Sequence, residues 1–132
     1  MARILVVEPN ITLAKIYKTI LIKNKHRVWL AKNAQEAINI ADKNNPDIVI
    51  LELQLPQHNG LEFLYEFRSY YEWRNTPVII QSLVPPDEFK DNYILWHKLG
   101  VSDYLYKPKS TLVQLMDLVN SYLPPQAINS SP

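Results

Sequence analysis

The chain has 132 residues, a length that fits one domain, and its share of hydrophobic residues, 47%, is that of an ordinary globular protein. A net charge of +1 gives no reason to expect nucleic acid or an anionic membrane as a partner, and the absence of cysteine excludes disulfides and thiol chemistry. With no signal peptide and no apolar run of membrane-spanning length in the sequence, we expect a cytoplasmic protein.

Short apolar segments recur along the chain and predict five strands. They cover residues 4–7, 28–30, 48–53, 78–80 and 104–106. Three of these segments are almost continuously apolar, which is typical of strands that are buried on both faces of a sheet.

The segments between the strands carry apolar residues at helical spacing. The five groups are Leu13, Ile16, Tyr17 and Ile20; Ala34, Ala37, Ile38 and Ala41; Leu64, Phe67 and Tyr71; Phe89, Tyr93 and Trp96; and Leu112, Leu115, Met116 and Val119. Asn33 with Glu36 and Asn59 with Glu62 have the spacing of capping boxes, and Gly100 lies where the fourth helix should end.

Five alternating strands and helices predict an α/β fold in which a doubly wound parallel sheet is covered by helices on both faces. The domain is expected over residues 1–123, and the polar, proline-bearing residues 124–132 are expected to form a flexible tail or a truncated linker. In such folds, ligands bind at the carboxyl ends of the strands.

Four polar residues lie at the ends of predicted strands. Glu8, Glu52 and Lys107 directly follow their strands, and Ser82 comes shortly after the fourth. A carboxylate at the end of a buried strand loses its solvation, and a lysine close by is the simplest compensation. The sequence therefore places a candidate site around these four side chains.

Five stretches of the chain resemble the receiver domain of two-component response regulators, and the resemblance extends over residues 3–123. They are Ile4-Leu5-Val6-Val7-Glu8, the stretch DIVILELQLP at residues 47–56, Asn59-Gly60, the stretch PVIIQS at residues 77–82, and the stretch DYLYKP at residues 103–108. The resemblance implies a flavodoxin-like (βα)5 fold with strand order 2-1-3-4-5 and a role in phosphorelay signal transduction.

The resemblance also implies roles for single residues. In that family an aspartate after the third strand accepts a phosphoryl group from a histidine kinase, and acidic residues after the first strand help to hold Mg²⁺. By this likeness Glu52 stands at the phosphoacceptor position and Glu8 at the first acidic position. Ser82 and Lys107 match the phosphate-binding positions, and Tyr104 matches the aromatic residue that changes rotamer on activation.

Two positions depart from the family pattern. Pro9 stands where the second acidic residue is usual, and proline offers no side-chain oxygen to Mg²⁺, which requires near-octahedral oxygen coordination. Glu52 carries one methylene more than aspartate, which displaces the reacting oxygen. We therefore expect no catalytic turnover and no cofactor beyond weak Mg²⁺ binding through Glu8, Glu52 and the backbone of Gln54.

The leading hypothesis is an atypical receiver domain that binds a signalling protein without being phosphorylated. In it, a charge-assisted contact between Glu52 and Lys107 stands in for the phosphorylated or metal-bound state. Three alternatives stay open: Glu52 is still phosphorylated by a histidine kinase, the ion pair is purely structural, or the domain is a small flavodoxin-like enzyme or nucleotide binder. The chain has only two glycines, which argues against a glycine-rich phosphate loop.

The resemblance places the partner surface on the fourth helix, the fifth strand and the fifth helix. Its candidate residues are Tyr93, Trp96, Tyr106 and Lys109, and aromatic side chains are favoured at interfaces. A histidine kinase, an output protein or a second copy of the chain would bind there, whereas nucleic acid and membranes are not expected. His58, in the loop after Glu52, is a weaker candidate for the site.

Overall fold

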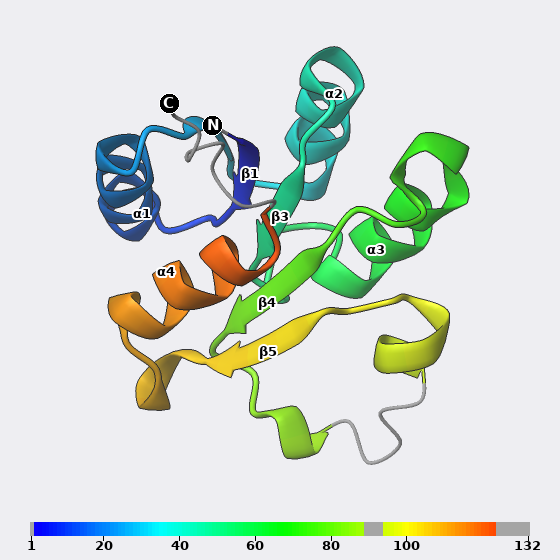
Figure 1. The fold of residues 1–132 in the computed structure, drawn as a ribbon. Coiled ribbons are helices and arrows are strands. Elements are labelled where there is room, and N and C mark those ends of the chain that lie inside the picture. Colours follow the sequence, from blue (N-terminus) through cyan, green and yellow to red (C-terminus); the bar gives the residue numbers. More distant parts are fainter. Residues whose placement is uncertain (1, 89–93, 124–132) are drawn as a thin grey trace.

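A five-stranded parallel sheet forms the centre of the computed structural model, which describes residues 2–88 and 94–123 (Figure 1). The strands are β1 (Arg3–Val7), β2 (Arg27–Ala31), β3 (Ile48–Leu51), β4 (Val78–Ser82) and β5 (Asp103–Tyr106). Their order in the sheet is β2-β1-β3-β4-β5, and every neighbouring pair is parallel. This order confirms the predicted flavodoxin-like topology.

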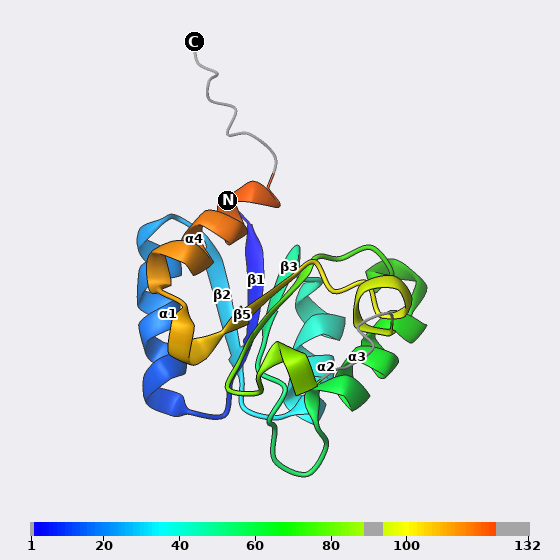
Figure 2. The ribbon, with the colours of Figure 1, turned by 90° about the horizontal axis from the view of Figure 1, so that it is seen from below.

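Helices cover both faces of the sheet. They are α1 (Ile11–Lys23), α2 (Ala34–Asn44), α3 (Gly60–Ser69), a short π-helical segment (Ile94–Lys98) and α4 (Leu112–Ser121). Figure 2 shows α1 and α4 on one face, with α2, α3 and the π-helical segment on the other. None of the helices in the described part of the chain is long and apolar enough to cross a membrane.

The core has two parts because side chains alternate across each strand. Leu5 and Val7 of β1 pack in the cluster that includes α2 and α3, whereas Ile4 and Val6 pack in the cluster that includes α1 and α4. Every residue of β3 and β4 is buried, as the continuous apolar runs predicted.

The predicted helix caps are partly confirmed. The side chains of Asn33 and Asn59 accept hydrogen bonds from the backbone N–H groups of Glu36 and Glu62, at 2.8 and 2.9 Å. The prediction of full capping boxes was wrong, because neither glutamate bonds back to the N–H of its cap residue. Glu36 accepts from the backbone N–H of Lys32 at 3.0 Å, and Glu62 pairs with the ring of His58. Each glutamate thus uses a donor that lies before the cap residue.

The periodicity misplaced two apolar side chains. Ile16 is 42% exposed whereas Tyr17 is 2% exposed, because α1 is apolar on more than one face and the spacing alone did not identify the buried one. Tyr71 is 81% exposed, because α3 ends at Ser69 and the chain continues as a 3₁₀ turn (Tyr71–Trp73). Phe89, Tyr93 and the tail at residues 124–132 lie outside the described residues.

Candidate functional site

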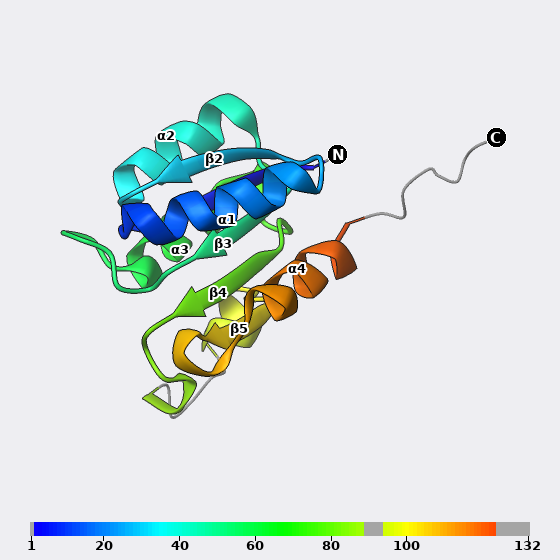
Figure 3. The same cartoon turned by 90° about the vertical axis from the view of Figure 1, so that its left-hand side faces the viewer.

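The four predicted site residues meet at the carboxyl ends of the strands. Parallel strands end at the same edge of a sheet, as the common direction of the arrowheads shows (Figure 3). The ammonium of Lys107, which follows β5, lies 2.6 Å from Glu8 Oε1 and 2.6 Å from Glu52 Oε1. Ser82, the last residue of β4, donates its hydroxyl hydrogen to Glu52 Oε2. The predicted contact between Glu52 and Lys107 is therefore present.

This cluster is almost entirely withdrawn from solvent. Glu52 is 2% exposed, Glu8 is 4% exposed and Ser82 is fully buried. Two carboxylates and one ammonium leave one net negative charge in the pocket. Such a charge is stable in a buried site only if further hydrogen bonds compensate its lost hydration.

The carboxylate of Glu52 accepts four hydrogen bonds. Oε1 accepts from Lys107 and from the backbone N–H of Leu83 at 3.1 Å, and Oε2 accepts from Ser82 and from the backbone N–H of Gln54 at 2.9 Å. Burial by itself raises the pKa of Glu52, but the Gln54 amide, the Lys107 ammonium and the Ser82 hydroxyl together hold this pKa below its ordinary value. The side chain is thus kept ionised.

Glu8 and Lys107 complete the charge arrangement. Glu8 Oε1 accepts from Lys107, and Glu8 Oε2 accepts from the backbone N–H of Asn10 at 3.1 Å, just beyond Pro9. Burial lowers the pKa of Lys107, yet its contacts with Glu52 and Glu8 outweigh burial and leave this pKa above its ordinary value. Lys107 therefore stays charged between the two carboxylates.

Ser82 and Tyr104 fix the loop that follows β4. While Ser82 donates to Glu52, its oxygen accepts from the backbone N–H of Val84 at 3.0 Å, so the residue serves both the site and the turn. The Tyr104 hydroxyl donates to the Val84 carbonyl at 2.5 Å, and burial raises the pKa of Tyr104 to about 12. The ring of the predicted switch aromatic is thereby tied to the same loop as the pocket.

The remaining predicted residues lie apart from this cluster. His58, the weaker candidate, is exposed and pairs with Glu62 at 3.0 Å. Trp96 in the π-helical segment is 37% exposed, Tyr106 on β5 is half-buried, and Lys109 is exposed. Their partner role stays a prediction.

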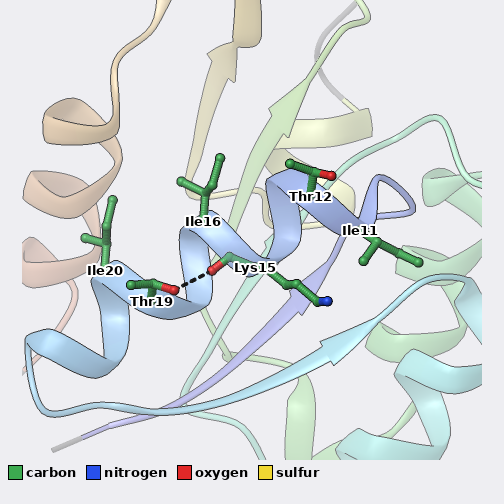
Figure 4. Close-up of a pocket in the computed structure, with 6 residues that line it drawn as sticks. All are labelled: Ile11, Thr12, Lys15, Ile16, Thr19 and Ile20. Carbon is green, nitrogen blue, oxygen red and sulfur yellow. Dashed lines mark hydrogen bonds between the residues drawn. The ribbon is translucent and has the colours of Figure 1, made fainter.

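Sequence reasoning missed two features. The backbone amides of Leu83 and Gln54 at Glu52 have no signature in the sequence, since any residue supplies an N–H. The second feature is an open surface on α1, where Ile11 is 60% exposed (Figure 4). This surface is lined by Ile11, Thr12, Lys15, Ile16, Thr19 and Ile20.

Within residues 2–88 and 94–123, no group of three or more His, Cys, Asp or Glu side chains is arranged to hold a metal ion. Both oxygens of Glu8 and both oxygens of Glu52 already accept hydrogen bonds from the protein. Pro9 adds no side-chain oxygen to this set.

Comparison with known proteins gives a consistent result. A family model described as the response regulator receiver domain matches residues 4–120. The structure is similar to the non-phosphorylated HemR receiver domain from Leptospira biflexa, with 26% identity, a TM-score of 0.78, and 96% of this chain and 98% of that chain covered. It is similar to the receiver domain of the Francisella response regulator 1452, with 30% identity, a TM-score of 0.79, and coverage of 92% and 96%. The chemotaxis response regulator CheY4 of Vibrio cholerae shares the fold at 22% identity, with a TM-score of 0.81 and coverage of 93% and 99%.

Proposed function

The chain belongs to the response regulator receiver domain family, a family of two-component signalling modules, and on this premise we propose that it signals without being phosphorylated. In this proposal Glu52, Glu8 and Lys107 hold the pocket in one fixed charge state. The domain then binds a signalling protein in that state and carries out no catalytic turnover.

The bridging position of Lys107 is the observation that carries the proposal. Its ammonium lies 2.6 Å from one oxygen of each buried carboxylate, so both charges are already partnered. Phosphoryl transfer depends on positioning the acceptor oxygen and neutralising the charge that develops around it. An oxygen of Glu52 that attacks phosphorus would first have to give up some of its four hydrogen bonds.

The donor set also favours the expectation that Mg²⁺ is bound weakly or not at all. Mg²⁺ is usually held by one or two carboxylates together with waters and phosphate oxygens. Glu8 and Glu52 are committed to Lys107 and to backbone N–H groups, and Pro9 supplies no ligand atom. The one net negative charge of the pocket would attract a cation. Because the carboxylate oxygens already accept hydrogen bonds, we expect any residual Mg²⁺ binding to be weak and to occur through water.

One alternative has a specific observation in its favour. Ser82 and Lys107, which match the phosphate-binding positions of the family, both contact the Glu52 carboxylate. A glutamyl phosphate formed there would find a hydroxyl and an ammonium within reach of its oxygens. Glu52 could then accept a phosphoryl group from a histidine kinase.

For the partner, we propose the surface that contains Trp96, Tyr106 and Lys109. Trp96 is 37% exposed, Tyr106 is half-buried and Lys109 is exposed, so aromatic and cationic side chains are available to a second protein or to a second copy of the chain. Tyr93, the fourth predicted member of this surface, lies outside the described residues.

Mass measurement after incubation with acetyl phosphate and Mg²⁺ tests the proposal. The matched variant is Pro9→Asp with Glu52→Asp, which restores the usual residues of the family. We expect the variant to gain the mass of one phosphoryl group and the wild type to gain none. A stoichiometric gain by the wild type would instead establish Glu52 as a phosphoacceptor.

A capture experiment tests the partner half of the proposal. Wild-type protein should retain the same signalling partner with and without phosphodonor. Binding of that partner by the Pro9→Asp, Glu52→Asp variant should instead depend on whether the phosphodonor is present. Partner binding by the wild type that requires the phosphodonor would contradict the proposal.

A further inference from the structure

A pocket of about 430 Å³ lies at the amino ends of β4 and β5, at the opposite end of the sheet from Glu52. Its lining residues come from the end of α3, the turn before β4 and the π-helical segment with the residues after it. These elements lie on the right-hand side of Figure 1. Among the described residues that line it, none is acidic, and three are basic beside one histidine. They are Arg68, Arg74, His97 and Lys98.

Arg68 is held in place at this pocket by neutral groups. Its guanidinium donates to the carbonyls of Leu99 at 2.7 Å, Trp73 at 2.6 Å and Gly100 at 3.0 Å. These bonds use three of the five N–H donors of an arginine, and no carboxylate of the described residues forms an ion pair with it. The cation is therefore fixed in position by neutral carbonyl groups.

Arg74 and Lys98 are positioned in a similar way by aromatic rings. The Arg74 guanidinium lies 5.3 Å from the ring centroid of Tyr71, and the Lys98 ammonium lies 5.7 Å from that of Tyr65. None of the ion pairs in residues 2–88 and 94–123 includes Arg68, Arg74 or Lys98. Three permanent cations thus line one pocket without a carboxylate partner, and their mutual repulsion favours an anionic ligand.

We propose that this pocket binds a small phosphate-bearing anion. Guanidinium groups match phosphate oxygens with paired hydrogen bonds, and a phosphoryl group carries more charge and more acceptor oxygens than a single carboxylate. Asn75, which also lines the pocket, adds amide donors. Because the pocket lies at the other end of the sheet, this binding does not depend on the state of Glu52.

Calorimetric titration of the full chain with inorganic pyrophosphate tests the inference. The variant Arg74→Gln with Lys98→Gln removes two of the cations and spares Arg68, whose side chain connects the end of α3 to the segments before β4 and β5. The control, Lys15→Gln with Lys23→Gln, removes the same charge from α1 on the other face of the sheet, where Lys15 is exposed (Figure 4). Citrate serves as a carboxylate probe of comparable charge.

We expect one pyrophosphate to bind per chain, with affinity at least about tenfold lower in the pocket variant and unchanged in the control. Amide signals of Arg74 and Gly100 should shift during the same titration followed by nuclear magnetic resonance. Absence of saturable binding, or an equal loss of affinity in the control, would overturn the site. Tighter binding of citrate than of pyrophosphate would overturn the phosphate assignment.

Discussion

Replacing Lys107 with methionine should destabilise the domain strongly. The substitution keeps a long apolar side chain but removes the ammonium that contacts Glu8 and Glu52, which are 4% and 2% exposed. Breaking a buried ion pair by removing one partner costs about 3–5 kcal/mol, a large share of the roughly 5–15 kcal/mol by which domains are stable. In urea, where the slope for small proteins is about 1–3 kcal/mol per molar, the unfolding midpoint should fall by at least about 1 M.

The pH dependence of this loss identifies its cause. In the wild type the folded-state pKa of Glu52 lies below its ordinary value, so its stabilising contribution is present above that ordinary value. The contribution is lost as pH falls through the lower folded-state pKa. Without Lys107, burial pushes the pKa of the carboxylate upward, and acidification then favours the folded variant. The stability difference between variant and wild type should therefore shrink between about pH 7 and about pH 4.

Lys15→Met is the matched control for this prediction. It makes the same chemical change at an exposed position of α1 and should alter stability by no more than about 0.5 kcal/mol. The measurement is the free energy of unfolding in urea of the wild type, Lys107→Met and Lys15→Met, at about pH 7 and about pH 4. The reasoning is refuted if Lys107→Met costs no more than the control, or if its cost does not change with pH.

Three smaller predictions concern the surroundings of the pocket, and urea unfolding measures each. Ser82→Ala removes a hydroxyl donor from Glu52 and should cost about 1–3 kcal/mol; a neutral effect would mean that this bond contributes nothing. Tyr104→Phe removes the hydroxyl hydrogen bond to the loop after β4 and should lower the free energy of unfolding by about 1 kcal/mol. In the wild type, an absorbance titration should show this tyrosine ionising only near its pKa of about 12. Gly60→Ala would place a Cβ 2.7 Å from the Cα of Leu53 and should cost more than about 1 kcal/mol; full stability would show that the backbone yields easily.

The sequence predicted the site because strand ends are readable in an α/β chain. Apolar runs located β1, β3, β4 and β5, and the parallel topology then required the residues after them to share one edge of the sheet. Glu8, Glu52, Ser82 and Lys107 follow from that rule, and their observed contacts agree with it. Opposite charge and the need to compensate burial were enough to pair the lysine with a carboxylate.

Other features could not be read from the residue types. The amide donors at Glu52 come from backbone positions, and the anchoring of Arg68 joins the end of α3 to carbonyls 31 and 32 residues farther along the chain. Ile16 and Tyr71 were misplaced for a different reason. Apolar residues occur on several faces of α1, and α3 ends before Tyr71, so periodicity did not distinguish core from surface.

If Lys107 and the two carboxylates fix the pocket in one state, the pocket should not respond to a titration with Mg²⁺ and beryllofluoride, a phosphoryl mimic. The backbone amide signals of Gln54, Leu83 and Val84 report on the pocket, since these groups bond to Glu52 or Ser82. We predict that these signals stay in place in the wild type and shift saturably in the Pro9→Asp, Glu52→Asp variant. Saturable shifts of the same amides in the wild type would show that the pocket still takes up the metal and the phosphoryl mimic, and would contradict the account.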